Sequence, residues 1–196
     1  MLFYQYMRKP RHIVLNAAYH ICARANRQEL ILEDEQIKLL FLEVLQRAKK
    51  KYGFIFRNFC IMGNHIHLEI TPQNDISISK IMQWILSVFA QQYNKKFGYK
   101  GHVWYDRFKS KVIESVQQLI NTYLYIANNP VRAALVDHPL KFAYSGITFY
   151  KNGPPSPTYK DLLDPLEDSS LQAAITMHLT DYDREKNSTV NLDYCF

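Results

Sequence analysis

The segment from Met62 to Ile70 constrains the fold most, because its side chains alternate between apolar and polar along a strand-like run. Side chains at every second position of a strand share one face. His65, His67 and Glu69 therefore share one face, and the residues between them form an apolar face. A Gly-Asn pair precedes the alternation, as in a tight turn. The pattern predicts a hairpin strand that packs on one side and presents two imidazoles on the other.

Hydrophobic periodicity predicts further strands and helices around this hairpin. Acidic residues at the start and lysines before a glycine at the end support a helix over 33–51. In chain order the predicted elements are a strand over 19–25, a helix over 33–51, a strand over 54–62, the histidine strand over 65–71, a helix over 77–97, a strand over 109–114 and a helix over 116–128. One antiparallel sheet with helices packed on one face satisfies this order. We therefore expect an α+β fold of ferredoxin-like type, with the histidine strand central.

The C-terminal part of the chain contains several signals that interrupt regular structure. Pro130 predicts a break or kink at Asn129, because proline disfavours helical conformation in the residue before it. Residues 138–150 are expected to form an irregular closing segment, and the proline-rich run at 153–157 is typical of a linker. We expect a main domain over 1–150 and a partly helical C-terminal extension over 151–196, whose role the sequence leaves open.

Charge is distributed unevenly along the chain. The formal net charge is +6, and residues 151–196 contain four Lys/Arg and eight Asp/Glu, a net of −4 that leaves +10 for residues 1–150. A basic main domain favours polyanionic partners. Three scattered cysteines do not form a disulfide framework, and we find neither a signal peptide nor a membrane span. We therefore expect a cytoplasmic protein with no membrane partner.

The last predicted helix of the main domain contains candidate catalytic residues. Tyr125 and Asn129 are four residues apart, so they share one helix face. Tyr123 is the competing hydroxyl, but a step of two residues puts it roughly on the other side of the helix. Two imidazoles, an amide oxygen and a phenol hydroxyl are sufficient for metal-assisted attack on a phosphodiester. Residues 101–111 combine aromatic and basic side chains, a composition that can bind single-stranded nucleic acid.

Three segments together resemble one known family. His65-Ile66-His67 resembles the HUH motif of single-tyrosine transposases, in the insertion-sequence transposase superfamily. The segment from Tyr125 to Val136 resembles the Tyr-Ile-x-x-Asn-Pro-Val-Arg block of the REP-associated branch of that family. Residues 104–110 resemble the Trp-x-x-Arg-Phe segment that precedes this block. The resemblance covers roughly residues 12–150 and implies an HUH nuclease fold.

The resemblance also implies a mechanism. His65, His67 and Asn129 would hold Mg²⁺ or Mn²⁺, and Tyr125 would attack a phosphate of single-stranded DNA next to a hairpin. The products would be a 5′-phosphotyrosine and a free 3′-hydroxyl, and a 3′-hydroxyl from another strand could reverse the step. The side chains expected to contact DNA are Arg11, Arg24, Trp104, Arg107, Lys109 and Arg132. The family further implies a bacterial, nucleoid-associated protein that acts as a monomer or homodimer, either on its own mobile element or, as a domesticated relative, on dispersed hairpins.

Two other functions fit the same residues. A non-catalytic module of similar fold would bind single strands through its aromatic and basic side chains, with no need of Tyr125. A metal-dependent hydrolase would activate water, with Glu69 as the nearest general base, and would form no covalent DNA adduct. The transposase hypothesis accounts for the absence of a GxxxxGK[ST] loop, because a covalent intermediate conserves the phosphodiester bond energy without ATP.

Overall fold

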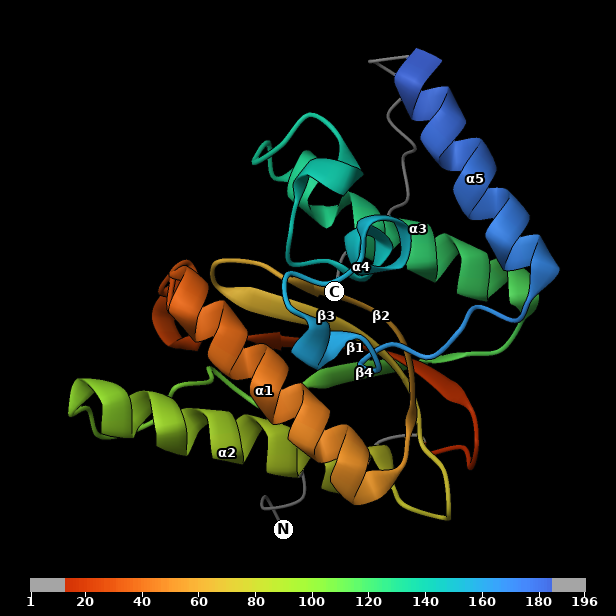
Figure 1. Cartoon of the computed structure of the whole chain (residues 1–196). Helices are drawn as coiled ribbons and strands as arrows, with labels where there is room; N and C mark the ends of the chain where they lie inside the picture. The colour runs from red at the N-terminus through yellow and green to blue at the C-terminus, as the bar shows by residue number, and fades with distance from the viewer. Residues whose placement is uncertain (1–12, 185–196) are drawn as a thin grey trace, which may run out of the picture.

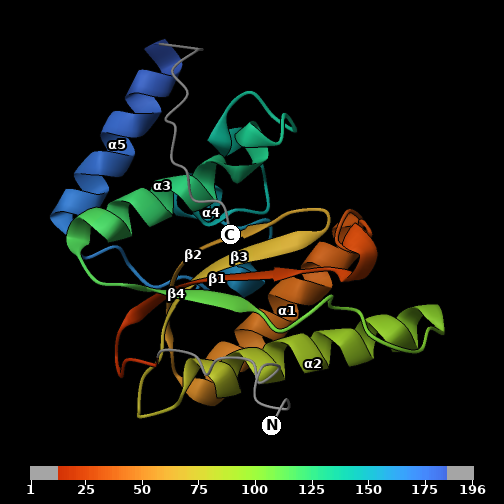
Figure 2. The same ribbon diagram turned by 180° about the vertical axis from the view of Figure 1, so that it is seen from behind.

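A four-stranded antiparallel sheet lies between two groups of helices in the computed structural model, which describes residues 13–184 (Figures 1 and 2). The strands are β1 (Ala18–Arg24), β2 (Ile55–Ile61), β3 (His65–Thr71) and β4 (Lys109–Ile113). The helices are α1 (Glu35–Tyr52), α2 (Ile78–Phe97), α3 (Val116–Arg132), α4 (Gly146–Asn152) and α5 (Ser169–Arg184), and the short 3-10 turns are η2 (Asn26–Gln28), η3 (Pro139–Lys141) and η4 (Pro157–Tyr159). The sheet order is β2-β3-β1-β4, so the predicted α+β fold is confirmed and the histidine strand is an inner strand.

The two faces of the sheet have different partners. Ile66, Leu68 and Ile70 of β3 are completely buried in the core that α1 and α2 complete. His65 and His67 are on the opposite face, because side chains alternate along the strand. Helix α3 crosses that opposite face (Figure 1). The predicted packing of helices on one face therefore holds for α1 and α2, whereas α3 covers part of the opposite face, which carries the histidines.

An irregularity in β2 explains how its aromatic residues all reach the core. The register with β3 shifts between Phe56 and Asn58, so that one extra residue, Arg57, is accommodated. Phe56 and Phe59 are an odd number of residues apart, yet both are fully buried and their rings stack 5.7 Å apart. The bulge also keeps Asn58 on the α3 side, where its Nδ2 donates to the carbonyl of Tyr123 at 3.0 Å.

The predicted break at Asn129 is wrong, because α3 continues through Pro130 to Arg132. Pro130 lies in the last turn, so its missing N–H removes one main-chain hydrogen bond, and its ring is buried. The N–H of Ala133 donates to the carbonyl of Asn129 at 3.0 Å and closes the helix beyond the proline. The conformational preference of one residue is therefore overridden by packing.

The predicted irregular segment at 138–150 also differs from the structure, because Gly146–Asn152 form α4. Gly146 begins this helix in close contact with Asn58 and Phe59, and a Cβ atom at this position would overlap the Asn58 side chain. The close approach of α4 to β2 depends on this tertiary contact, which no local pattern indicates.

Residues 153–184 pack against the sheet and α3. The carboxylate of Asp164 accepts a hydrogen bond from the N–H of Phe56 at 2.7 Å and lies 2.8 Å from the Lys49 ammonium. Helix α5 lies along the outer side of α3 (Figures 1 and 2) and shares an apolar cluster with it. No helix within residues 13–184 is long and apolar enough to cross a membrane.

Candidate active site

The two histidines of β3 and the tyrosine of α3 are close together. The ring centroids of His65 and His67 are 5.0 Å apart, and the ring of Tyr125 lies 5.7 Å from that of His67. Because α3 crosses the face of β3 that carries the histidines, one chain brings all three side chains together. The proximity that the resemblance implies for these residues is therefore present in the structure.

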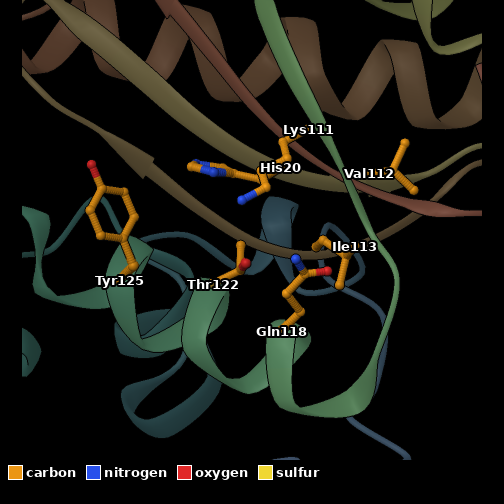
Figure 3. Close-up of a pocket in the computed structure, with 7 residues that line it drawn as sticks. All are labelled: His20, Lys111, Val112, Ile113, Gln118, Thr122 and Tyr125. Carbon is orange, nitrogen blue, oxygen red and sulfur yellow. The ribbon is translucent and has the colours of Figure 1, made fainter. Parts of the chain in front are cut away.

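A third histidine, which the sequence analysis missed, joins this group. His20 of β1 is buried, and its Nε2 lies 3.0 Å from Nδ1 of His67. Its ring stacks on that of His67 at 5.2 Å and lies 5.7 Å from the ring of Tyr125. In Figure 3 the His20 ring extends from β1 toward Tyr125. Alternation in the predicted first strand could have assigned His20 to a face, but not to a neighbour, because the pairing of β1 with β3 is not a local property.

The hydrogen bonds of Asn64 determine which nitrogen of His65 is available. The Nδ2 of Asn64 donates to the carbonyl of Gln28 at 3.3 Å, so its Oδ1 is the atom that faces Nδ1 of His65 at 2.6 Å. An amide oxygen can only accept, so His65 carries its proton on Nδ1. This arrangement leaves the Nε2 lone pair of His65 free to bind a metal ion.

The second imidazole and the amide can be oriented in the same way. When His67 donates its Nδ1–H to Nε2 of His20, its own Nε2 lone pair is available to a metal. The Nδ2 of Asn129 donates to the carbonyl of Tyr125 at 2.8 Å, which leaves the Oδ1 of Asn129 as a ligand atom. Within residues 13–184 no three His, Cys, Asp or Glu side chains form a metal-binding group. The amide oxygen is thus the third protein ligand that this donor set can offer, and two imidazoles with one amide oxygen fit a divalent cation that keeps several waters.

Burial keeps the three imidazoles neutral. Desolvation lowers the pKa of His65 to about 4, with a smaller contribution from Arg24, and it lowers the pKa of His20 to about 4 together with Lys111. The pKa of His67 is lowered well below its usual range, first by desolvation and then by its histidine neighbours and Arg24. Neutral imidazoles are the form that binds metal, so the site needs no deprotonation at neutral pH.

Glu69 lies on the same face of β3 but in a different environment. Its side chain is 1% exposed, and neither carboxyl oxygen has a hydrogen-bond partner among the described residues. Burial raises the pKa of Glu69 to about 7. The hydroxyl of Tyr123, also buried and without a partner in the described part of the chain, has its pKa raised by burial and then by Glu69. Tyr123 is thus turned into the protein interior, whereas Tyr125 faces the histidines.

A cleft between β4 and α3 opens beside the tyrosine (Figure 3). It is lined by His20, Lys111, Val112, Ile113, Gln118, Thr122 and Tyr125. The guanidinium carbon of Arg132 lies 5.3 Å from the centroid of the Tyr125 ring. Two exposed cationic side chains, those of Lys111 and Arg132, therefore lie near the tyrosine, where they could bind a phosphate group.

Most of the basic side chains predicted to contact DNA are exposed around this site. Arg24 of β1 is the register partner of His65 on β3. Lys109 of β4 is the register partner of Cys22, which lies on β1 two residues before Arg24. Arg107 precedes β4 and is exposed, as Arg24, Lys109 and Arg132 are. Arg11 lies outside the described residues.

Trp104, for which contact with DNA stays a prediction, is half-buried and packs on the core. Its ring lies 5.4 Å from Phe89 and 6.2 Å from Phe41 in the core, and its indole N–H donates to the carbonyl of Leu86 at 3.0 Å. A ring held in this way anchors the loop before β4, and its neighbour Tyr105 is the exposed aromatic residue of the pair.

Comparisons with known proteins identify a family and a similar fold. The family model described as "Transposase IS200 like" matches residues 13–129. The fold is similar to that of a REP-associated tyrosine transposase bound to a REP hairpin, with 18% sequence identity and a TM-score of 0.63 over 83% of this chain and 91% of that chain. A protein of Deinococcus radiodurans R1, described as a transposase on a provisional basis, matches with 13% identity and a TM-score of 0.44 over 76% of this chain and 100% of that chain. None of the curated proteins matches in sequence.

Proposed function

The chain belongs to the IS200-like transposase family, whose members process DNA, and on this basis we propose that it cleaves and rejoins single-stranded DNA at hairpins through a covalent bond to Tyr125. The observation that carries the proposal is the position of Tyr125 beside His67, at 5.7 Å between ring centroids, within one chain. A nucleophile next to a pair of neutral imidazoles is the arrangement that metal-assisted attack on a phosphodiester requires.

The proposed step exchanges one phosphate ester for another. The Oη of Tyr125 loses its proton and forms a bond to phosphorus, while the bond from phosphorus to the 3′-oxygen breaks. The leaving 3′-oxygen takes up a proton, so the products are a 5′-phosphotyrosine and a 3′-hydroxyl. Attack by a 3′-hydroxyl from another strand reverses the exchange and joins that strand, and Tyr125 regains its proton.

Residues around the tyrosine make this exchange feasible. An ordinary phenol has a pKa of about 10, so it is a weak nucleophile at neutral pH unless its anion is stabilised. The guanidinium of Arg132, 5.3 Å from the ring centroid, stabilises the phenolate and the phosphate that approaches it. Arg24, beside His65, offers a second charge for the DNA backbone.

The ligands for Mg²⁺ or Mn²⁺ would be Nε2 of His65, Nε2 of His67 and Oδ1 of Asn129. When bound, the cation would neutralise charge on the scissile phosphate. Asn64 and His20 hold the two imidazoles with their Nε2 atoms available, and the main chain of α3 holds the Asn129 amide.

The proposed substrate is a DNA hairpin with a single-stranded flank. The structural neighbour was solved with a REP hairpin, which supports this class of substrate, and the basic main domain supplies attraction to the DNA backbone. The resemblance of the block from Tyr125 to Val136 to the REP-associated branch favours action on dispersed chromosomal hairpins over action on the protein's own mobile element. Action as a monomer or as a homodimer also stays a prediction.

An adduct assay tests the proposal directly. Wild-type protein, Mn²⁺ and labelled hairpin DNA with single-stranded flanks would be incubated and analysed on denaturing gels for a protein–DNA adduct that resists boiling. We expect the adduct with wild type and none with Tyr125→Phe or His67→Ala. Tyr123→Phe is the matched control, because it removes a buried hydroxyl two residues away on the same helix, which has no hydrogen-bond partner among the described residues, and it should still form the adduct.

The other outcomes each identify a different function. Cleavage without an adduct would contradict the proposal in favour of a metal-dependent hydrolase. Loss of the adduct in Tyr123→Phe, with adduct formation by Tyr125→Phe, would show that Tyr123 is the nucleophile and that the proposed Tyr125 is not. Binding of several hairpins with no cleavage in either Mn²⁺ or Mg²⁺ would favour a non-catalytic module.

A further inference from the structure

The loop after α2 exposes aromatic rings that the proposed cleavage chemistry does not use. Phe97 is 43% exposed, Tyr99 is 59% exposed and Tyr105 is 72% exposed. Burial of large aromatic side chains is energetically favourable, so several exposed rings in one short segment indicate a surface that another molecule covers.

Two of these rings, Phe97 and Tyr99, form a stack with the half-buried Tyr93, and we call these three residues the aromatic platform. Tyr93 and Phe97 are 4.8 Å apart, and Phe97 and Tyr99 are stacked at 5.7 Å with an angle of 23° between their planes. At its base Tyr93 stacks on the fully buried Phe89 at 5.9 Å. The platform is therefore built outward from the core, with Tyr99 at its exposed end.

Main-chain hydrogen bonds hold the platform in place. Gly98 adopts a left-handed conformation with φ of 67°, which lets the chain turn back at the end of α2. The N–H of Tyr99 then donates to the carbonyl of Asn94 at 2.9 Å, and the side chain of Asn94 donates to the carbonyl of Gly101 at 3.0 Å. An exposed ring on an ordered backbone loses little entropy when a ligand stacks on it.

Tyr105 connects this loop to the candidate active site. Its N–H donates to the carbonyl of Arg24 at 3.0 Å, and Arg24 is the register partner of His65. The preceding residue, Trp104, forms an isolated bridge with Ala25 and packs on the core, whereas Tyr105 is exposed. The main chain of Tyr105 therefore lies beside β1, the strand next to the one that carries His65.

The surroundings of these rings are basic. Residues 94–111 contain six basic side chains and one acidic side chain, Asp106. Lys95, Lys96 and Lys100 lie within two residues of the platform rings and are exposed. The pKa of Tyr93 is raised by burial, then by Tyr99 and by the acidic Glu29, so Glu29 lies near the base of the platform. Aromatic rings among cations are suited to a ligand with flat bases and a negatively charged backbone.

We propose that Tyr105 and the aromatic platform stack on unpaired bases of the single strand that leads away from the cleavage site, while neighbouring lysines bind its phosphates. The inference rests on the proposed function and adds the segment of substrate that this loop recognises. Paired bases in a hairpin stem are already stacked on each other, so only unpaired bases can use the rings.

The test compares two DNA probes on the full chain. Tyr125→Phe protein in EDTA, which is unable to cleave, would be titrated by fluorescence anisotropy with a blunt hairpin and with the same hairpin carrying a single-stranded tail. We expect Tyr99→Ala and Tyr105→Ala each to raise Kd for the tailed probe roughly tenfold and to leave Kd for the blunt probe unchanged. Tyr150→Ala, which removes a tyrosine that is 42% exposed on α4, is the matched control and should change neither value.

Two further measurements separate stacking from charge. Tyr99→Phe should retain the affinity for the tailed probe, because the ring remains. Tyr99→Ala should leave the slope of log Kd against log salt unchanged, whereas Lys100→Ala should reduce it by about 0.7 for a single strand. Equal losses on both probes, or no loss on either, would overturn the proposal, as would a dimer in sedimentation that Tyr99→Ala converts to a monomer. None of these results would alter the adduct assay on Tyr125, so a failure here is distinguishable from a failure of the proposed function.

Discussion

At the scale of single side chains, the candidate site depends on which nitrogen of each imidazole carries the proton. In metal-free protein at neutral pH, nitrogen-15 correlation spectra should find His65 with its proton on Nδ1, because Asn64 Oδ1 can only accept. Asn64→Ala should release this constraint and weaken Mn²⁺ binding about 10- to 100-fold. Asn152→Ala, at the exposed end of α4, is the control. A proton on Nε2 of His65 in the wild type would contradict this assignment.

Glu69 should make stability depend on pH in a direction opposite to that of most carboxylates. Its pKa in the folded protein is raised to about 7 from 4.5, so the folded state holds a proton that the unfolded state loses above pH 4.5. Stability is therefore full below about pH 4.5 and is lost as pH rises toward 7, by about 3 kcal/mol at most. Glu69→Gln should raise the free energy of unfolding in urea at pH 8 and change it little at pH 5. An equal effect at both pH values would disprove the charge argument.

Sequence reasoning reached some of these side chains and not others, for a physical reason. His65 and His67 share a strand, and Tyr125 and Asn129 share a helix face, so local geometry alone relates the members of each pair. His20 is 47 residues from His67 and meets it only because β1 pairs with β3. Trp104 and Tyr105 are adjacent and both aromatic, and only the packing of the core determines which of them is exposed.

At the scale of elements, α3 lies between the sheet and α5. The apolar cluster on its outer side contains Leu171 and Ile175 of α5, both fully buried. Asn128 of α3 and His178 of α5 are also hydrogen-bonded, with 3.0 Å between Nδ2 and Nε2. The helix that carries the candidate nucleophile is thus supported by residues that the sequence analysis assigned to an extension of unknown role.

Shortening one side chain of α5 should therefore loosen α3. Leu171→Ala should cost about 2–4 kcal/mol of unfolding free energy and increase hydrogen exchange in α3 as well as in α5. Met177→Ala, on the same helix but 68% exposed, should stay within about 0.5 kcal/mol of wild type. If exchange in α3 were unchanged by Leu171→Ala, α5 would not support the tyrosine helix.

Long periodic elements were predictable, and the exceptions arise from tertiary contacts. Helices α1 and α2 have caps, glycine ends and apolar stripes that are visible in sequence, and their bounds differ from the predicted ones by only one or two residues. Pro130 lies inside α3 because burial of its ring outweighs one lost hydrogen bond. Helix α4 is short and depends on the close approach of Gly146 to Asn58, so it carries no periodic signal of its own.

At the scale of the whole molecule, the histidines and the tyrosine of the candidate site belong to one chain. A mixture of His67→Ala and Tyr125→Phe proteins should therefore form no DNA adduct, because each chain lacks one component. If the site were instead completed between two chains of a dimer, mixing would restore about a quarter of the wild-type sites. The adduct gel with mixed variants distinguishes the two arrangements.

The basic residues on β4 have a consequence for the protein itself. β4 is an edge strand, and an unpaired strand edge is a template on which the sheet of another molecule can grow. Lys109 and Lys111 place like charges wherever two such edges would meet, so mutual repulsion opposes the pairing of two copies along β4. Salt weakens this repulsion together with the attraction to DNA, and a buffer that strips nucleic acid from the protein therefore also brings it closer to precipitation.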